Sequence, residues 1–384
     1  MLIKTQRKFL RRSFVPAALL VVLFVAAFSA TSQTPAKSPF APTSLADAIE
    51  RSRELVKSQI APKVPGLSVA VAADGKIVWS EGFGFADVEN KIPAGASTRF
   101  RIGSVSKSVT AAGLMLLVER GKLDLDAPVQ KYVPGFPDKG AVITTRQLAG
   151  HLAGIRHYKG DEFLLNKPFK TVREGLTIFE NDPLLAPPGT KYSYSTYGWN
   201  LISAVMEAAA KQEFLSYMEK NVFAKLHMNS TRPDRAGAAD AQRTQFYESD
   251  PQGKFVVASA VDSSYKWAGG GFLSTSEDLV RFGSAHLQPG FLKKESLELL
   301  FTSQKTSDGK ETGYGIGWSI LKDAAGHRIL MHTGGSMGGT SVLLVHPDSK
   351  IVVAMICNYG RSPFSKDARE AIAEFFAPLF ASGK

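Results

Sequence analysis

The 384-residue sequence has a single cysteine, Cys357, which excludes an intramolecular disulfide. It ends the apolar run that starts at Ile351, and this setting predicts a buried strand residue with an inert thiol. Metal-binding patterns are also missing, because the seven histidines include no His-Glu-x-x-His. We do not interpret His151 and His157, which lie in a predicted loop, as a metal site. We therefore expect no metal and no cofactor.

Long basic runs are missing as well. The formal net charge is +11, but residues 1–30 carry five basic residues and no acid, which leaves 41 basic against 35 acidic residues elsewhere. No basic run is interleaved with aromatic residues, so nucleic acid is not an expected partner. A small molecule or peptide fits better as the substrate, and no feature of the sequence specifies an oligomeric state.

Residues 1–30 have the layout of a signal peptide. A basic start precedes the apolar run from Val15 to Phe28, which small residues follow. We expect an exported protein, in the bacterial periplasm or secreted. Because no ideal cleavage site follows, an uncleaved anchor with membrane association through residues 15–28 is the alternative. Residues 31–44, rich in Pro, Ser, Thr and Ala, predict a linker.

Residues 45–384 show strand-like runs near both ends and helix signals in the middle. This order predicts an α/β (α+β) fold, in which one antiparallel sheet is flanked by terminal helices. We place an α/β lobe at residues 45–103 and 268–384, and an inserted, mostly helical lobe at 104–267. The predicted strands are 66–72, 76–81, 314–321, 328–332, 340–346 and 351–358; the predicted helices include 45–56, 145–152, 199–210, 274–287 and 365–376.

Ser104 is the candidate nucleophile. It lies where an extended segment meets an apolar, helix-forming run. A serine hydroxyl needs a base, and Lys107, three residues on, shares its face on a helix but not on a strand. Burial and the positive end of the helix dipole disfavour an ammonium, so Lys107 is the expected proton acceptor. The alternative is that Ser104 only caps the helix.

The pattern Ser-x-x-Lys is not specific by itself, because it occurs three more times in the chain. The rival serines lie before a glycine-rich loop, in a polar turn and in a predicted strand, where the lysine would point away. Only Ser104 opens a long apolar helix. The rival pairs are Ser263/Lys266, Ser307/Lys310 and Ser319/Lys322.

Two further segments carry candidate groups. A rigid Pro-Pro-Gly turn precedes a cluster of hydroxyls that contains Tyr194, and a phenol near a lysine can pass protons between nucleophile and leaving group. His332, Thr333 and Gly334 end a predicted strand, where small residues let a substrate backbone lie alongside.

Together the three segments, in this order, resemble the motifs of the serine β-lactamase and D,D-peptidase superfamily, namely Ser-x-x-Lys, Tyr-x-Asn and Lys/His-Thr-Gly. Within it the chain resembles most the class C-related serine hydrolases, a group that includes mitochondrial β-lactamase-like proteins. The match covers about residues 60–360. The resemblance implies a β-lactamase/transpeptidase-like fold, acylation of Ser104, shared base and acid roles for Lys107 and Tyr194, and an oxyanion hole from the backbone N–H groups of Ser104 and Gly335.

Two positions depart from these motifs. Thr196 replaces the usual Asn, and His332 replaces the lysine that β-lactamases use against a substrate carboxylate. A histidine of ordinary pKa, about 6.5, is mostly neutral at pH 7, so we expect it to attract carboxylates only as the pH falls. A peptidase, amidase or esterase therefore fits better than a β-lactamase or D,D-carboxypeptidase.

Two alternatives remain. Residues 334–338 match the Gly-x-Ser-x-Gly elbow of α/β-hydrolases around Ser336, but a strand-like run follows where that fold requires a helix, so we interpret them as a hairpin. A penicilloyl-type sensor or binding module without turnover would share every motif. Kinetics of single against multiple turnover would separate it from a hydrolase.

Overall fold

The computed structural model describes residues 42–323 and 325–380. The predicted signal peptide or anchor at 1–30, and the predicted linker up to residue 41, lie outside the described residues. In the described part of the chain, no helix has the length and apolar character needed to cross a membrane.

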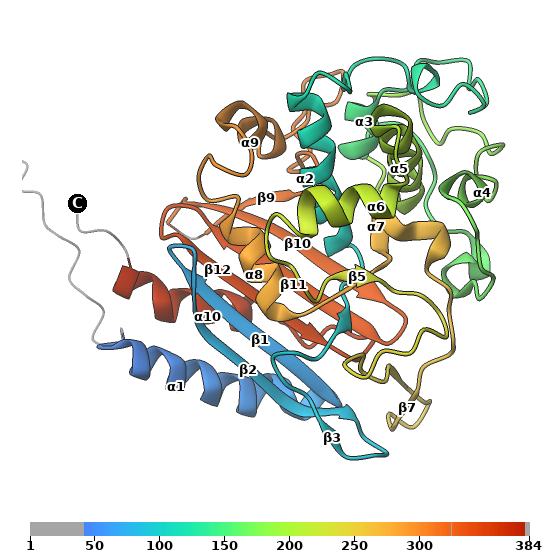
Figure 1. Ribbon diagram of the computed structural model, residues 1–384. Helices are drawn as coiled ribbons and strands as arrows, with labels where there is room; N and C mark the ends of the chain where they lie inside the picture. The colour runs from blue at the N-terminus through green and yellow to red at the C-terminus, as the bar shows by residue number, and fades with distance from the viewer. Residues whose placement is uncertain (1–41, 324, 381–384) are drawn as a thin grey trace, which may run out of the picture. The chain divides into compact units, whose positions relative to one another are not determined.

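Seven strands form one antiparallel sheet in the order β3-β2-β1-β12-β11-β10-β9 (Figure 1). Its central pair joins the two ends of the chain, because β1 pairs with β12 from Leu67 opposite Cys357 to Ala73 opposite Ile351. The predicted fold class is confirmed. The strands are β1 (Gly66–Ala73), β2 (Lys76–Asp87), β3 (Ile92–Pro93), β9 (Ser319–Lys322), β10 (Arg328–Ser336), β11 (Gly339–His346) and β12 (Ile351–Cys357).

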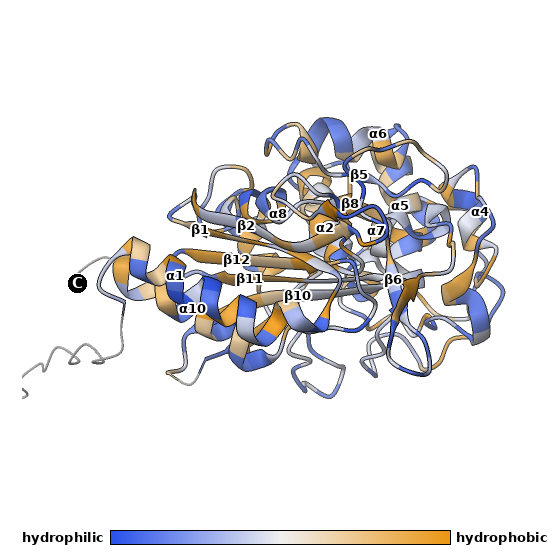
Figure 2. Cartoon of the chain, turned by 90° about the horizontal axis from the view of Figure 1, so that it is seen from below, coloured by the Kyte–Doolittle hydropathy of each residue, from blue (hydrophilic) through white to orange (hydrophobic). Residues whose placement is uncertain are grey.

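Helices cover both faces of this sheet. Successive strand residues point to opposite faces, so β1 and β12 supply two separate cores and are apolar throughout. One core holds α1 (Leu45–Leu55) and α10 (Lys366–Phe380), and the other holds α2 (Val105–Glu119) and α8 (Ser276–Ser284). Figure 2 shows the apolar strands as a layer with α1 and α10 on one side and α8 and α2 on the other. Cys357 is fully buried, as predicted.

The remaining elements surround α2. Thirteen of its fifteen residues are buried, which explains why it is apolar on every side. The other helices are α3 (Thr145–Ala149), α4 (Val172–Leu176), α5 (Thr196–Ala210), α6 (Phe214–Met218), α7 (Trp267–Gly270) and α9 (Lys294–Leu300). Two small sheets contain β4 (Phe100–Arg101), β8 (Phe272–Ser274) and β5 (Arg232–Pro233), and β6 (Tyr247–Ser249) with β7 (Phe255–Val257).

Three local predictions were wrong. The strand predicted at 314–321 is only Ser319–Lys322, because Gly317, with φ +76°, turns the chain away from the sheet. The cap of α8 is Thr275, whose side chain accepts the Asp278 N–H, and not Ser274, which belongs to β8. The segment after Ser263 is helical instead of a loop, since a 3₁₀ turn at Ser264–Lys266 leads directly into α7.

Candidate active site

Ser104 sits at the junction of β4 and α2. Its backbone is already helical, with φ −67° and ψ −10°, and its side chain makes no capping hydrogen bond to the helix. The hydroxyl instead lies 3.0 Å from Lys107 Nζ. The Ser104 side chain therefore does not act as a helix cap.

Lys107 is fully buried on the first turn of α2. Burial, and secondarily the charge of Lys266, hold the pKa of Lys107 well below its usual value of 10.5. Nζ also contacts the Gly269 carbonyl at 2.6 Å and Thr196 Oγ1 at 3.1 Å. A neutral amine has two N–H groups and one lone pair. Because the carbonyl and the Thr196 hydroxyl can accept both hydrogens, the lone pair is free to accept the proton of Ser104.

Tyr194 directly precedes α5 and completes this group. Its ring centroid lies 4.9 Å from Lys107 Nζ. Burial raises the pKa of the phenol, and a hydrogen bond with Ser104 partly offsets the rise, so the group stays protonated at neutral pH. The structure thus brings together the four predicted residues Ser104, Lys107, Tyr194 and Thr196.

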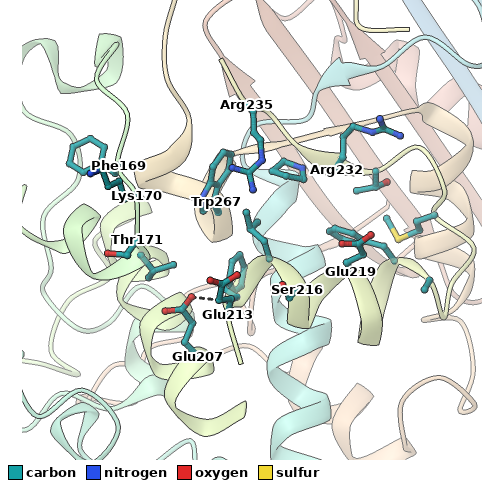
Figure 3. Close-up of a pocket in the computed structure, with 18 of the residues that line it drawn as sticks. Phe169, Lys170, Thr171, Glu207, Glu213, Ser216, Glu219, Arg232, Arg235 and Trp267 are labelled. Atoms are coloured by element: carbon teal, nitrogen blue, oxygen red, sulfur yellow. Dashed lines mark hydrogen bonds between the residues drawn. The ribbon is translucent and has the colours of Figure 1, made fainter. Parts of the chain in front are cut away.

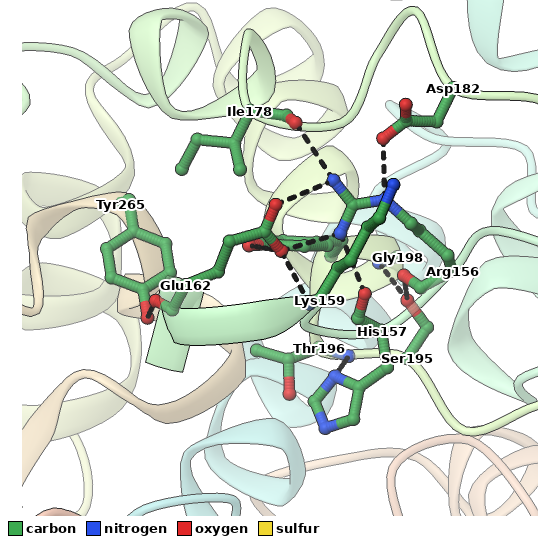
Figure 4. Close-up of polar contacts among 11 residues, drawn as sticks. Arg156, His157, Lys159, Glu162, Ile178, Asp182, Ser195, Thr196, Gly198 and Tyr265 are labelled. Atoms are coloured by element: carbon green, nitrogen blue, oxygen red, sulfur yellow. Dashed lines mark hydrogen bonds and ion pairs between the residues drawn. The ribbon is translucent and has the colours of Figure 1, made fainter. Parts of the chain in front are cut away.

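A network of ion pairs holds the loop in front of α5 (Figure 4). Arg156 Nη1 lies 2.6 Å from Glu162 and Nε lies 2.5 Å from Asp182. The Arg156 carbonyl accepts the hydroxyl of Ser195, the N-cap of α5, at 2.7 Å, and the Thr196 N–H donates to His157 Nδ1 at 3.3 Å. These bonds fix the start of α5, and with it Tyr194 and Thr196, relative to the loop.

The end of β10 lies against the Ser104 turn. A Cβ built on Gly103, where φ is +47°, would lie 2.6 Å from Gly335 N, and one on Gly334 would lie 1.9 Å from the Ile102 carbonyl oxygen. Only glycine permits this approach. β9 pairs with β10 no further than Met331, which leaves the outer edge of His332 to Ser336 without a partner strand in the described chain. Thr333 and Gly335 are exposed there.

His332 does not offer a cation to a substrate. It is 4% exposed, and burial, with the charge of Lys107, lowers its pKa to about 3. Nδ1 lies 2.7 Å from the Thr333 carbonyl and therefore carries the proton, so Nε2 accepts the Tyr314 hydroxyl at 2.9 Å. Our expectation that His332 becomes protonated near pH 6.5 was wrong, because the ring is buried and both of its nitrogens are engaged by Tyr314 and Thr333.

The cavity at Ser104 has a volume of about 300 Å³. Its walls include predicted residues, namely Thr196 and Gly335, and residues that the sequence reasoning missed: His157, Tyr158, Phe163 and Lys266. The sequence held a signal for Lys266, since it ends one of the rival Ser-x-x-Lys patterns. Its meaning depends on the tertiary packing that brings α7 beside α2.

A larger cavity, of about 730 Å³, lies elsewhere (Figure 3). Glu207, Glu213 and Glu219 lie on one side of it, and Arg232 and Arg235 on another. None of its lining residues belongs to the Ser104 group. We place the candidate active site in the smaller cavity, because Ser104 lines it together with Thr196 and Gly269, two residues that contact Lys107 Nζ.

The geometry fits a serine hydrolase, since a buried lysine lies one helical turn from the candidate nucleophile Ser104 and a free sheet edge lies beside it. A family model described as Beta-lactamase matches residues 48–376, and the chain belongs to that family. The serine β-lactamase-like protein LACTB, mitochondrial, of Homo sapiens is 34% identical, over 89% of this chain and 82% of its own length.

Solved structures agree. The octameric penicillin-binding protein homologue from Pyrococcus abyssi has a TM-score of 0.74 and 27% identity, and the match covers 86% of this chain and 77% of that one. A D-stereospecific amidohydrolase from Streptomyces sp. has a TM-score of 0.72 over 84% of this chain and 98% of its own. At 24% identity this second likeness shows the fold alone.

Proposed function

We propose that the protein is a serine hydrolase that cleaves peptide, amide or ester bonds through an acyl-enzyme on Ser104. The observation that carries this proposal is the placement of the buried Lys107 amine 3.0 Å from Ser104 Oγ, with its other contacts able to accept its hydrogens. Membership of the Beta-lactamase family supports the same chemistry.

The reaction has two halves. Lys107 accepts the hydroxyl proton as Ser104 Oγ forms a bond to the substrate carbonyl carbon, and the N–H groups of Ser104 and Gly335 stabilise the oxyanion. The bond to the leaving group then breaks as Tyr194, supplied with a proton from Lys107, protonates that group. Water attacks the acyl-enzyme with the same groups in reversed roles, which releases the acid and restores Ser104.

Hydrolysis of β-lactams or D,D-peptides is the second candidate, and resemblance to penicillin-binding proteins supports it. The neutral, buried His332 argues against it, because the cation that β-lactamases have at this position is missing. A sensor that is acylated once and not released is the third. A small molecule or peptide is the proposed partner, without nucleic acid. From the basic and apolar character of residues 1–30 alone, we propose export.

Labelling with a fluorophosphonate tests the proposal. The adduct should lie on the tryptic peptide Ile102–Lys107, and Ser104→Ala should abolish it. Ser336→Ala is the matched control, because Ser336 ends β10 and only the rival elbow would make it a nucleophile. An adduct on Ser336 would refute the assignment. Wild-type protein is then assayed with ester, amide, peptide and β-lactam substrates. Multiple turnover of any of them indicates a hydrolase, and a single acylation without release indicates a sensor.

A further inference from the structure

A second buried lysine lies at the Ser104 cavity. Lys266 precedes α7, is 2% exposed, and lines the cavity together with Ser104. In the described part of the chain, its Nζ has no hydrogen bond and no ion pair. Lys266 Nζ lies 5.1 Å from the ring centroid of Phe163 and 5.3 Å from that of Tyr265. Burying an ammonium without a paired anion costs free energy, so we expect an anionic ligand to pair with Lys266.

The nearest carboxylates are already engaged. Asp234 accepts Arg101 Nε and Arg243 Nη2, both at 2.7 Å. Asp262 accepts both the backbone N–H, at 2.8 Å, and the hydroxyl of Ser264. Lys266, Arg101 and Arg243 thus share two carboxylates. One positive charge remains, and Lys266 is the member of the group that lines the cavity.

The two lysines of the site differ in charge. Burial lowers the pKa of Lys266 to about 8, and Arg101 lowers it further while Asp234 and Asp262 raise it, so the amine is mostly protonated at pH 7. Burial and the charge of Lys266 hold the pKa of Lys107 well below its usual value of 10.5, and no carboxylate offsets them. One cavity therefore has a neutral lysine that acts as the base beside a charged lysine that is free for binding.

The rest of the wall limits the size and chemistry of a ligand. Tyr158 and Phe163 offer aromatic surface, with ring centroids 5.5 Å apart, and the volume of about 300 Å³ is at the low end for ligand pockets. Gly270 adds no side chain to the wall between Ser104 and Lys266, where a Cβ would lie 3.7 Å from the Gly103 backbone and 4.0 Å from Lys266 Cδ. A short apolar chain ending in an anion fits this wall.

We propose that Lys266 binds a carboxylate at the end of the substrate group that fills the Ser104 cavity, so that the enzyme prefers small carboxylate-bearing acyl substrates. This inference rests on the proposed function, since it needs Ser104 as the acylated residue. The position of the cation also differs from that of His332, which is neutral and does not line the cavity.

The test uses two fluorophosphonates that share one short alkyl chain, one ending in a carboxylate and the other in its methyl ester. The second-order rate of Ser104 labelling is measured for each by intact mass. In wild-type protein we expect the carboxylate probe to react about 10-fold faster or more, the size expected for a hydrogen bond between charged groups. Lys266→Met should bring the ratio of the two rates to about one.

Two variants make the result specific. Lys266→Arg keeps the charge and should keep most of the ratio, which a general loss of folding would not do. Lys191→Met removes the same charge from an exposed position in the loop before Tyr194 and should leave the ratio unchanged. Equal rates for both probes in wild-type protein, or an unchanged ratio in Lys266→Met, would overturn the inference about Lys266 and leave the proposed function standing. If neither probe labels Ser104, the proposed function fails and this inference with it.

Discussion

Gly103 and Gly335 touch through their backbones, so that a Cβ on Gly103 would lie 2.6 Å from both the nitrogen and the oxygen of Gly335. This contact sets the distance between the nucleophile turn and the free edge of β10. Gly103→Ala should therefore cost at least about 1–3 kcal/mol of unfolding free energy, from the positive φ alone, and lower the activity further. Urea unfolding and kcat/KM measure the two effects.

Gly335→Ala is the informative counterpart. A Cβ there meets no atom within 4 Å, yet Gly335 lines the Ser104 cavity. We expect the free energy of unfolding to stay within about 0.5 kcal/mol of wild type, the usual range for such sites, while kcat/KM falls because the methyl group occupies substrate space. Gly95→Ala, also without a neighbour within 4 Å, should change neither quantity. Equal stability losses at Gly103 and Gly335 would contradict this account.

We predict that Ser104 and Lys107, whose side chains lie 3.0 Å apart, act as one proton-transfer unit. Ser104→Ala and Lys107→Ala should each abolish turnover, and the double variant should be no slower than either single one, since residues that act as a unit give losses that do not add. Steady-state rates with one ester substrate are sufficient. A Lys107→Ala variant with nearly wild-type kcat would remove Lys107 from the role of base.

Tyr194 should matter for proton transfer more than for substrate binding. Tyr194→Phe keeps the ring beside Lys107 and removes the hydroxyl that bonds to Ser104. We expect kcat for an amide substrate to fall by about 10²–10⁴, the usual contribution of a general acid or base, with a small change in KM. Tyr192→Phe, two residues earlier in the same loop, is the control. Similar losses in both variants would point to packing instead of catalysis.

Buried histidines should make the fold sensitive to acid. His286 is fully buried, and burial lowers its pKa from 6.5 to about 4, although the Phe282 carbonyl raises it slightly. Between these pH values the unfolded chain binds more protons than the folded one. The contribution of the neutral His286 to the free energy of unfolding is therefore complete above about pH 6.5. It is lost as the pH falls toward 4 and amounts to on the order of 3 kcal/mol in total.

His286→Leu should reduce this pH dependence. Urea unfolding at pH 7 and pH 4.5 should show a smaller difference for His286→Leu than for wild type. The exposed His227 provides the control, and His227→Asn keeps a residue that tolerates the local φ of +53°. Parallel stability profiles for wild type and His286→Leu would mean that other groups cause the acid sensitivity.

Local pattern was sufficient to predict the first half of the site. Ser104 and Lys107 are adjacent on one helix, so their relationship depends only on helical spacing and on the apolar run that follows. The pairing of the sheet from both chain ends followed from the order of strand and helix signals. Tyr194 and His332 were candidates from their own segments, but only the family resemblance joined them to Ser104 in one site, because no periodicity links residues so far apart in sequence.

The charge state of His332 and the position of Lys266 could not be predicted from the sequence, because both depend on burial and tertiary packing. His332 has an ordinary sequence context, and only the Tyr314 hydroxyl and the surrounding side chains show that its ring stays neutral. Lys266 was dismissed together with Ser263 because the glycines after it predicted a loop. In the structure Gly269 and Gly270 belong to α7, the Gly269 carbonyl contacts Lys107, and Lys266, just before this helix, lines the cavity.

The turn at Gly317 also leaves one edge of the sheet open. Ser108 Oγ donates to the Gly317 carbonyl at 2.6 Å, which ties the segment before β9 to α2 and away from β10. The backbone groups thereby left open at the end of β10 can pair with any extended peptide, including a strand of another copy. A change that let β9 pair with β10 beyond Met331 would cover this edge, so that no extended peptide, whether a second copy or a substrate, could pair there.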